Sequence, residues 1–328
     1  MQGQVFKIHS DFYYVNNNAT VYECKLRENI KKQKIDVWVG DFVEFENGAI
    51  TSLIKRKNQI KRPHVANIDT LLVVSALKEP ELDLVQLNRY LIFAKYYGVK
   101  TAICFNKEDL EENLGFEKDI MKLYSDLGYD IFFTSAKEET GILPLRKYLK
   151  GKLTAFAGAS GVGKSTLINV LTGENLRKTN IVSDKTKRGT HTTRHVEIVE
   201  KDDMKIVDTP GFSQVPFDFL TPEELIKLFD DIYIYTADCK FSNCLHRNEI
   251  NCGVIKNKDK IGTLRYESYL KFLEEALEYR EKIKTISIKK EANFKEHQGK
   301  YAPKISTKKR EDSRRKVKQT ILDELNWQ

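Results

Sequence analysis

The sequence predicts a multidomain protein with an N-terminal β-barrel, a central α/β domain, and a C-terminal module of helices that binds a metal. Three observations favour this fold class. Short β-type runs with polar turns fill the first 62 residues, a glycine-rich loop near residue 160 separates an apolar run from a helical one, and three cysteines cluster with a histidine near residue 245. We expect the barrel at 1–65, the α/β domain at 66–215, the module at 216–284 and a basic tail at 285–328.

The barrel is predicted from five β-type runs, at 4–8, 12–15, 19–26, 41–45 and 49–54. An OB-type barrel fits runs of this length, and such barrels often bind single-stranded nucleic acid. Basic residues in or beside its loops are Lys31, Lys32, Lys34, Lys55, Arg56, Lys57, Lys61 and Arg62. A solvated barrel that binds protein, or no ligand, explains the same pattern.

A phosphate-binding loop is predicted at 158–165, between an apolar strand at 152–157 and a helix at 165–171. The glycines free the backbone to point its N–H groups at phosphates, Lys164 supplies the catalytic positive charge, and Ser165 a hydroxyl for magnesium. The full G-x-x-x-x-G-K-S match makes a turn that binds nothing a poor alternative. The expected phosphate contacts are Gly158, Ala159, Ser160, Gly161, Val162, Gly163, Lys164, Ser165 and Thr166.

Two further loops follow predicted strands and suggest that the base is guanine. Asp109, in Asn106-Lys107-Glu108-Asp109, can accept hydrogen bonds from the ring N–H and the exocyclic amine of guanine, a donor pair that adenine lacks. The strand at 130–133 leads into a second loop that supports the guanine carbonyl. Carboxyl ends of such strands are where α/β sheets bind ligands. The expected base contacts are Asn106, Lys107, Glu108, Asp109, Ser135, Ala136 and Lys137.

The order of these motifs is inverted. In ordinary GTP-binding domains the phosphate loop precedes the guanine-binding tetrapeptide, whereas here Asn106 precedes Gly158. The α/β domain is therefore predicted to be a P-loop GTPase domain with circularly permuted motif order.

The remaining nucleotide-binding residues are expected after the phosphate loop. A strand at 205–207 leads into Asp208-Thr209-Pro210-Gly211. Asp208 is suited to hold magnesium through a water, and the Gly211 N–H is suited to contact the γ-phosphate. The polar segment 188–194 is typical of a nucleotide-dependent switch, from which Thr192 or Thr193 could reach magnesium. A solvated loop is the alternative for this segment.

Phe212 follows Gly211, where Ras-like proteins carry the glutamine that orients the attacking water. We therefore expect slow intrinsic hydrolysis. His191 is the best local substitute, because an imidazole can orient or deprotonate water near neutral pH. An ordinary exposed histidine is an equally good interpretation.

A structural zinc site is predicted from the four clustered residues Cys239, Cys244, His246 and Cys252. A Cys3His set fills a tetrahedral zinc ion and leaves no position for a catalytic water. Idle thiols in a loop are the alternative, since the spacing is not the common C-x-x-C. Cys24 and Cys104 lie in strand-like apolar runs and are expected in the core, and five cysteines argue against a disulfide framework.

The basic excess is concentrated at the C-terminus. The chain has 55 Lys+Arg and 47 Asp+Glu; residues 285–320 hold 12 and 4 of these, which leaves 43 of each sign elsewhere. The tail therefore resembles a basic arm that binds polyanions. A solvated, disordered end is the alternative interpretation. No run approaches the roughly 18 apolar residues of a membrane helix and no signal peptide is evident, so we expect a cytoplasmic protein with no membrane partner.

With these motifs in place, the chain resembles the RsgA (YjeQ/YloQ) family of bacterial GTPases. The resemblance rests on the barrel strand 39–43, the entry to the GTPase at 62–69, the permuted order, His191-Thr192-Thr193-Arg194, the Cys/His cluster and the helix that begins at 265–269. It covers roughly residues 1–284, and the tail is longer and more basic than is usual in the family.

The resemblance implies a GTPase that is stimulated by the small ribosomal subunit and acts in the late maturation of that subunit. We expect it to bind GTP or GDP with Mg2+, to hold one Zn2+ ion, to contact the rRNA of the subunit and to be a monomer. A nucleotide-regulated RNA-binding scaffold with incidental hydrolysis is the main alternative. The guanine-binding tetrapeptide argues against an ATPase or kinase. Because the module follows Gly211 within about thirty residues, a nucleotide-dependent shift could reach it along the chain, and a flexible insertion after Phe217 should then uncouple the two.

Overall fold

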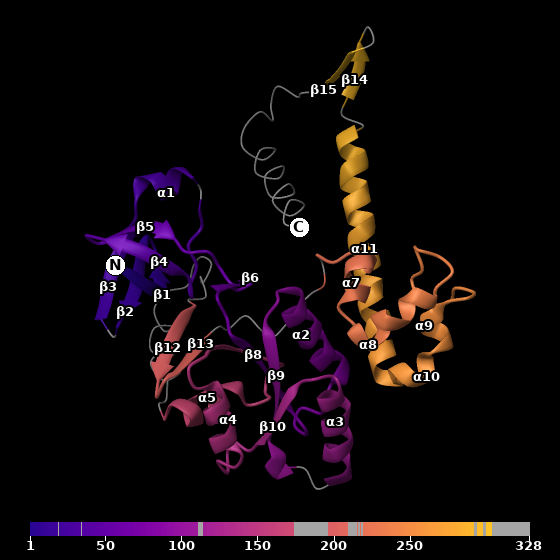
Figure 1. Cartoon of the computed structure of the whole chain (residues 1–328), viewed down its shortest axis with the longest axis horizontal. Coiled ribbons are helices and arrows are strands. Elements are labelled where there is room, and N and C mark those ends of the chain that lie inside the picture. Colours follow the sequence, from indigo (N-terminus) through magenta and orange to yellow (C-terminus); the bar gives the residue numbers. More distant parts are fainter. Residues whose placement is uncertain are drawn as a thin grey trace, which may run out of the picture. The chain divides into compact units, whose positions relative to one another are not determined.

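The structure, a computed structural model, describes residues 1–18, 20–33, 35–110, 114–173, 196–208, 215, 217, 219–291, 294–297 and 300–303. The chain divides into two compact units. The first consists of Met1–Pro216 with Glu223–Phe272, and the second of Phe217–Pro222 with Leu273–Gln328. Figure 1 labels the helices and strands along the chain. The nucleotide and metal motifs all belong to the first unit.

The first unit begins with a closed five-stranded barrel, as predicted. Its elements are β1 (Gln2–His9), β2 (Phe12–Asn17), β3 (Thr20–Leu26), α1 (Glu28–Lys32), β4 (Phe42–Glu46) and β5 (Ala49–Leu53). The strands pair in the order β1-β2-β3-β5-β4, and β1 also pairs with β4, which closes the sheet. Alternate side chains point inward and bury a core that includes Val5, Val15, Val43, Phe45 and Ile50. Cys24 is buried there, as expected.

A charged pair connects the barrel to the segment that follows it. The Arg56 Nε and Nη2 atoms donate to the two carboxylate oxygens of Asp41 at 2.7 and 2.8 Å, and the Asp41 side chain is fully buried. The Arg56 guanidinium also lies 4.3 Å from the ring centre of Trp38. Arg56 is therefore a structural residue, unlike the exposed basic residues Lys55 and Lys61. The hairpin of β6 (Gln59–Lys61) and β7 (His64–Ala66) follows.

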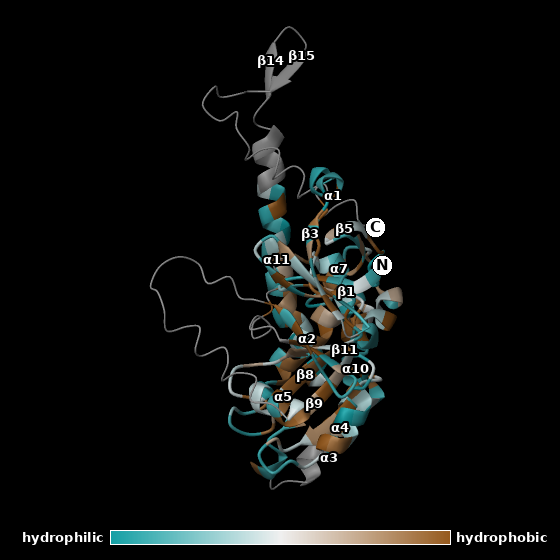
Figure 2. Ribbon diagram, turned by 90° about the vertical axis from the view of Figure 1, so that its left-hand side faces the viewer, coloured by the Kyte–Doolittle hydropathy of each residue, from teal (hydrophilic) through white to brown (hydrophobic). Residues whose placement is uncertain are grey.

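The central domain contains a six-stranded sheet in the order β10-β9-β8-β11-β13-β12. The strands are β8 (Thr70–Ala76), β9 (Lys100–Asn106), β10 (Asp130–Thr134), β11 (Leu153–Ala157), β12 (Glu197–Lys201) and β13 (Met204–Asp208). All are parallel except β12, which is antiparallel to β13. Continuous apolar runs form β8, β9 and β11 because helices cover both faces of a parallel sheet, and these strands are coloured as hydrophobic in Figure 2.

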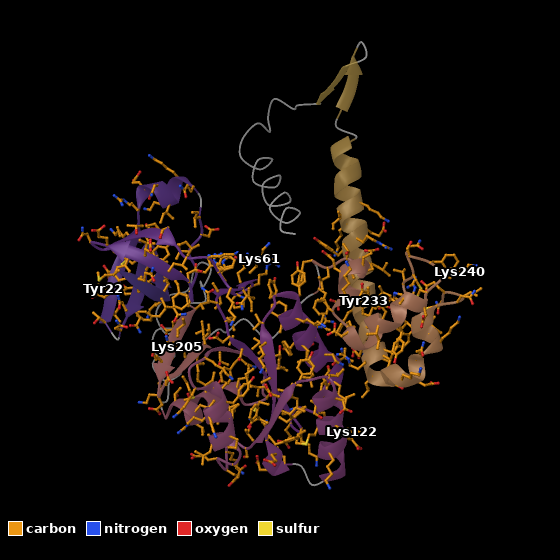
Figure 3. All side chains as sticks on the ribbon, in the orientation of Figure 1. Tyr22, Lys61, Lys122, Lys205, Tyr233 and Lys240 are labelled. Carbon is orange, nitrogen blue, oxygen red and sulfur yellow. The ribbon has the colours of Figure 1, made fainter. Side chains whose placement is uncertain are left out.

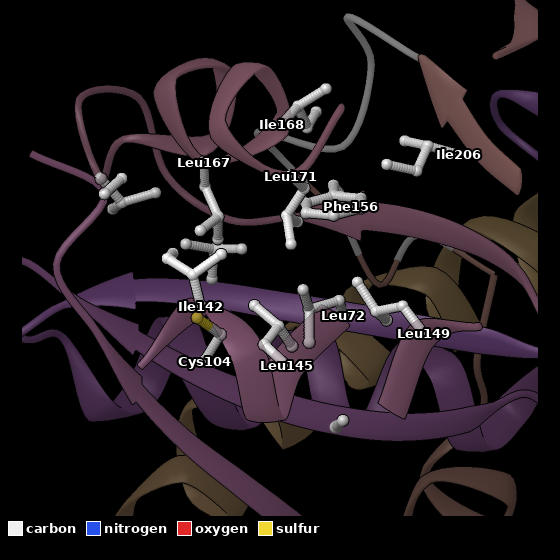
Figure 4. Close-up of a cluster of buried hydrophobic side chains, with 14 of the residues drawn as sticks. Leu72, Cys104, Ile142, Leu145, Leu149, Phe156, Leu167, Ile168, Leu171 and Ile206 are labelled. Carbon is white, nitrogen blue, oxygen red and sulfur yellow. The ribbon is translucent and has the colours of Figure 1, made fainter. Parts of the chain in front are cut away.

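Helices cover this sheet from both sides. On one face, α4 (Ile142–Leu149) and α5 (Lys164–Thr172) bury a cluster with the even-numbered residues of β8 and β9, including Leu72 and Cys104 (Figure 4). On the other face lie α2 (Leu84–Tyr96), which contacts β8 and β9, and α3 (Leu114–Asp126), which contacts β10. Each fully buried aliphatic side chain contributes about 2 kcal/mol, so this two-sided burial stabilises the sheet.

The barrel and the central sheet form one continuous sheet. β12 pairs with β1 at Glu197 and Lys7, and the side chains of the same two residues form an ion pair at 3.0 Å. The Lys205 Nζ atom on β13 also donates to the Gln4 Oε1 atom at 3.3 Å. The edge strand of the central domain is thereby covered by the barrel, which removes an exposed edge.

The C-terminal module of the first unit consists of short helices around the Cys/His cluster. These are α7 (Pro222–Lys227), α8 (Asp230–Tyr233), η2 (Ile234–Asp238), α9 (Gly253–Lys256), α10 (Lys258–Ile261) and the start of α11 (Thr263–Glu291). Phe229, Tyr269 and Phe272 form its aromatic core, with ring centres 5.7 and 6.1 Å from that of Phe229. This core is small for a folded module, so a metal is expected to add stability.

The second unit combines the later part of α11 with the short segment 217–222. The Phe217 N–H donates to the Glu275 carboxylate at 3.2 Å, and Phe217 and Leu220 are fully buried. The strands β14 (Phe294–His297) and β15 (Lys300–Pro303) form an antiparallel hairpin. Among the residues that the structure describes, no helix has the length and apolar character needed to cross a bilayer.

Candidate nucleotide and metal sites

The phosphate loop follows β11 and leads into α5, as the sequence predicts. Gly158 and Gly163 have φ angles of 146° and 91°. A Cβ atom on Gly158 would lie 2.1 Å from the Val74 carbonyl oxygen, and one on Gly163 would lie 2.3 Å from the Asn106 Nδ2 atom. Backbone angle and available space therefore both require glycine at these positions.

The Lys164 ammonium group lies over this loop. Its Nζ atom donates to the carbonyl oxygens of Gly158 at 2.7 Å and Ala159 at 2.6 Å. Ser165 lies in the first turn of α5, whereas Ser160, Gly161 and Thr166 are exposed. The loop thus presents a cation and a helix N-terminus on the same side, an arrangement suited to a polyphosphate.

Asn106 cross-links three of the predicted loops. It is the last residue of β9 and is buried, and its Nδ2 atom donates to the Val162 carbonyl of the phosphate loop at 2.9 Å. Its Oδ1 atom accepts from the Ala136 N–H and the Thr134 hydroxyl, both at 3.1 Å. Motifs 56 residues apart in the chain are thereby held together by one side chain. The sequence indicated that Asn106 contacts the base, and this cross-linking role was missed.

The predicted base-binding residues lie side by side. The Ser135 hydroxyl donates to the Asp109 Oδ1 atom at 2.5 Å and accepts from the Glu138 N–H at 3.1 Å. Asp109 is exposed within η1 (Glu108–Leu110), where its carboxylate is accessible to a ligand. Lys107 has a φ of 64°, and its Nζ atom donates to the Glu79 carbonyl. The Lys137 ammonium pairs with Glu138 at 3.1 Å.

Cys104 packs against Thr134, one of the residues that hold Asn106. It is fully buried, and burial raises the pKa of its thiol to about 12. Its Sγ atom lies 3.2 Å from the Thr134 hydroxyl, which in turn donates to Asn106. Cys104 is therefore a protonated packing residue, as expected from its apolar setting.

The predicted magnesium ligands are described only in part. β13 is parallel to β11, so its carboxyl end at Asp208 reaches the sheet edge that carries the phosphate loop. The structure describes the backbone of Asp208 but not its side chain. His191, Thr192, Thr193 and Gly211 lie outside the described residues, and their roles stay predictions.

The four predicted zinc ligands converge. The donor atoms of Cys239, Cys244, His246 and Cys252 all lie within 4.8 Å of one another. The two Sγ atoms of Cys239 and Cys252 are 3.8 Å apart, and each lies 3.5 Å from the His246 Nδ1 atom. Zn–S bonds of about 2.3 Å place two sulfur ligands of a tetrahedral ion about 3.8 Å apart, so the cluster has the dimensions of a zinc site.

Supporting residues hold the loop that carries His246. The Glu249 carboxylate accepts from the N–H groups of Leu245 at 2.7 Å and Arg247 at 2.9 Å. Burial acts to raise the pKa of Glu249, but these N–H groups outweigh it and the pKa is lowered. On α11, the Tyr266 hydroxyl donates to the His246 carbonyl at 2.7 Å. The sequence gave no reason to assign Glu249 or Tyr266 a supporting role at the metal cluster.

Comparisons with known proteins agree with this architecture. The model of the RsgA N-terminal domain matches residues 2–51, and that of the RsgA GTPase matches residues 52–218. A protein of Clostridium novyi (strain NT) described as small ribosomal subunit biogenesis GTPase RsgA is 43% identical over 285 residues, 85% of this chain and 98% of the relative. A protein of the same description from Clostridium botulinum (strain Loch Maree / Type A3) is 38% identical over 291 residues, 86% of this chain and 99% of the relative.

Two solved structures are also similar. The crystal structure of YjeQ from Thermotoga maritima is 34% identical with a TM-score of 0.71 and covers 84% of this chain and 98% of its own. YloQ, described as a circularly permuted GTPase, is 29% identical with a TM-score of 0.70 and covers 84% and 95%. Together with the inverted order of the loops that Asn106 joins, these matches show that the chain is a GTPase and belongs to the RsgA family of circularly permuted GTPases.

Proposed function

We propose that this GTPase binds the small ribosomal subunit and hydrolyses GTP during the late maturation of that subunit. The observation that carries the proposal is the similarity, over nearly the full length of the relatives, to proteins described as small ribosomal subunit biogenesis GTPases. The convergence of the phosphate loop and the two predicted base-binding loops on Asn106 supports it, since loops held together in this way suit a single site for a guanine nucleotide.

In the proposed site, Lys164 and the N–H groups of the phosphate loop hold the phosphates, and Asp109 with Ser135, Ala136 and Lys137 reads guanine. Ser165, Asp208 and either Thr192 or Thr193 would hold Mg2+, which neutralises phosphate charge when bound. Phosphoryl transfer to water depends mainly on position and charge. His191 would orient the water once rRNA holds its loop in place. Its replacement by alanine should abolish stimulated turnover and leave GTP binding unchanged.

Cys239, Cys244, His246 and Cys252 would hold one Zn2+ ion. The donor set is complete, so the ion would stabilise the module rather than activate water. We further propose that exposed lysines bind rRNA phosphates, namely Lys31 and Lys32 of the barrel, Lys55 and Lys61 of the segment that follows it, and those of the basic tail at 285–328. Lys61, the last residue of β6, and Lys240, in the C-terminal module, are labelled in Figure 3.

The test is GTP turnover by the full chain with and without purified small ribosomal subunits, with large subunits as the control. We expect slow turnover alone and stimulation of at least about a hundredfold by small subunits, because positioning of a water by an added group has effects of this order. Unchanged turnover despite binding to the subunit would instead favour a nucleotide-regulated scaffold.

A further inference from the structure

A buried polar cluster joins the GTPase domain to the C-terminal module. Asn88, on α2, and Ser268, on α11, are fully buried, and the Asn88 Nδ2 atom donates to the Ser268 hydroxyl at 2.9 Å. The Asn88 Oδ1 atom accepts from Arg265 Nη1 at 2.9 Å and from the Tyr124 hydroxyl at 3.3 Å. One asparagine therefore binds two helices of the GTPase domain to the first turns of α11.

The Arg265 charge is fully paired within this cluster. Its Nε and Nη2 atoms donate to the two carboxylate oxygens of Asp231 on α8, both at 2.9 Å, and its guanidinium lies 4.7 Å from the Phe229 ring centre. The Arg265 side chain is 3% exposed. A satisfied buried network of this kind allows one arrangement of its elements, since any shift leaves a buried charge or amide unpaired.

The neighbouring residue Arg89 links the same helix to the exit of the nucleotide site. Its Nη1 atom donates to the Val215 carbonyl at 3.3 Å, and its guanidinium lies 4.6 Å from the Phe272 ring centre on α11. Val215 is buried, and the chain reaches it seven residues after Asp208. Arg89 thus contacts both the segment that leaves the nucleotide site and the helix that carries the module.

We propose that helix α2 transmits the nucleotide state to the C-terminal module, with Arg89 as the positioning residue and the Asn88–Arg265 contact as the rigid joint. A displacement of Val215 moves Arg89, and Asn88 follows because adjacent residues of one helix move together. The signal then reaches α11 through side chains and does not need the covalent connection at 216–222. This inference rests on the proposed guanine nucleotide site.

Hydrogen exchange of the full chain, with GDP or a non-hydrolysable GTP analogue bound and no ribosomal subunit added, tests the proposal. In the wild type, amide exchange should differ between the two nucleotides by about fivefold or more in 158–165 and also in 266–272, the lower range of typical coupling between sites. In Arg89→Ala the difference should persist in 158–165 and disappear in 266–272. Phe272→Leu keeps an apolar side chain but removes the ring face that contacts Arg89. It should reduce the difference in exchange in 266–272 without abolishing it.

Lys95→Ala is the matched control. Lys95 also lies on α2 and pairs with Asp230 of α8, but this ion pair is solvent-exposed and should contribute little. Its exchange should match the wild type. A nucleotide-dependent difference in 266–272 that survives in Arg89→Ala, or is absent from the wild type while 158–165 responds, overturns the proposal. Equal exchange in 158–165 with either nucleotide would count against the guanine site itself.

Discussion

At the scale of single residues, the proposed nucleotide site depends on side chains that join loops as much as on side chains available to a ligand. The three described hydrogen bonds of the Asn106 side chain all go to other parts of the protein, namely Val162, Thr134 and Ala136. The Asp109 carboxylate, in contrast, is exposed and held by a single serine hydroxyl. The two residues of one tetrapeptide therefore have different physical tasks.

Asn106→Ala should both destabilise the protein and weaken nucleotide binding. The substitution removes three hydrogen bonds of about 1 kcal/mol each and leaves the buried Ala136 N–H unpaired, so the free energy of unfolding should fall by about 3 kcal/mol. Denaturant unfolding and titration with a fluorescent GDP measure the two effects. Thr134→Val, which removes only one hydroxyl, should cost about 1 kcal/mol; an equal loss in both variants would refute the cross-linking role.

Asp109→Asn should change the base that the site prefers. The amide keeps one acceptor but replaces the other with a donor, which opposes the guanine amine and suits the carbonyl at the same position of xanthine. We expect GTP affinity to fall by about a hundredfold and XTP to bind more tightly than GTP. Competition binding with the two triphosphates measures this, and Asp126→Asn, at an exposed acid of α3, serves as the control and should keep the wild-type preference. Retained preference for GTP would exclude Asp109 as the base-reading residue.

At the scale of elements, the metal loop is organised by α11 and by an acidic residue outside the ligand set. Tyr266 and Tyr269, one helical turn apart, donate to the carbonyls of His246 at 2.7 Å and Leu245 at 2.9 Å. Glu249 binds the N–H groups of the same loop. The four ligands are thus presented by a loop with its own supports, so the start of α11 and the metal site should stabilise each other.

Glu249→Ala should weaken zinc binding by about 10- to 100-fold, the usual effect of removing an outer support from a metal ligand. Competition with a chromophoric chelator measures the affinity, and elemental analysis should give one zinc per wild-type chain. Asp259→Ala, an exposed acid on α10, is the control and should bind zinc like the wild type. Equal affinities of the two variants would contradict the supporting role of Glu249.

The edge of the central sheet has a pH-dependent contact between β9 and β10. Burial acts to raise the pKa of Asp130, but Lys100 at 3.0 Å and the Tyr148 hydroxyl outweigh it and lower the pKa below its ordinary 3.8. A carboxylate with a lowered pKa adds stability that is complete above the unfolded value and disappears as the pH falls through the folded value.

Asp130→Asn should therefore be less stable than the wild type at pH 7 by under about 1 kcal/mol, since both partners are partly exposed. The difference should shrink as the pH falls below the ordinary value of 3.8 and through the lowered folded value. Urea unfolding of both proteins at pH 7, 5 and 3 checks the sign, and a difference that grows as the pH falls would contradict it.

At the scale of the whole molecule, charge is divided between a formally neutral body and a basic tail. Because the positive excess lies in residues 285–320, long-range attraction to a polyanion should depend on that segment. Within the first unit, the barrel and the central sheet share a strand pairing at Lys7 and Glu197.

Replacing the tail residues Lys308, Lys309, Arg310, Arg314, Arg315, Lys316 and Lys318 by glutamine should weaken binding to small subunits and lower its salt dependence. If all seven neutralise phosphates, the slope of log affinity against log salt should become shallower by about 5. Binding measured from 50 to 300 mM salt gives the slope, and intrinsic GTP turnover should not change. An unchanged slope would show that these tail residues do not neutralise phosphates and would favour a solvated end.

Much of the architecture follows from local sequence patterns. Short β-type runs separated by turns over 1–62 predicted the five-stranded barrel, the strand–loop–helix pattern around Gly158 predicted β11 and α5, and the Cys/His cluster predicted the metal site. These features depend on residues close together in the chain, whose spacing reflects the geometry of one element or one ligand set. The inverted motif order was likewise readable without coordinates.

Contacts between distant segments were decided only by the tertiary structure. Nothing local distinguishes Arg56, buried against Asp41, from the exposed Lys55 beside it, because burial depends on what packs over a residue. The Asn88–Arg265 contact joins residues 177 positions apart, and neither belongs to a motif that names a partner. The sequence alone therefore determined which chemical groups this GTPase contains and their order along the chain. The packing of α2 against α11 decided how the nucleotide site is joined to the metal-binding module, because the pairing of buried polar groups across helices is a property of the assembled fold.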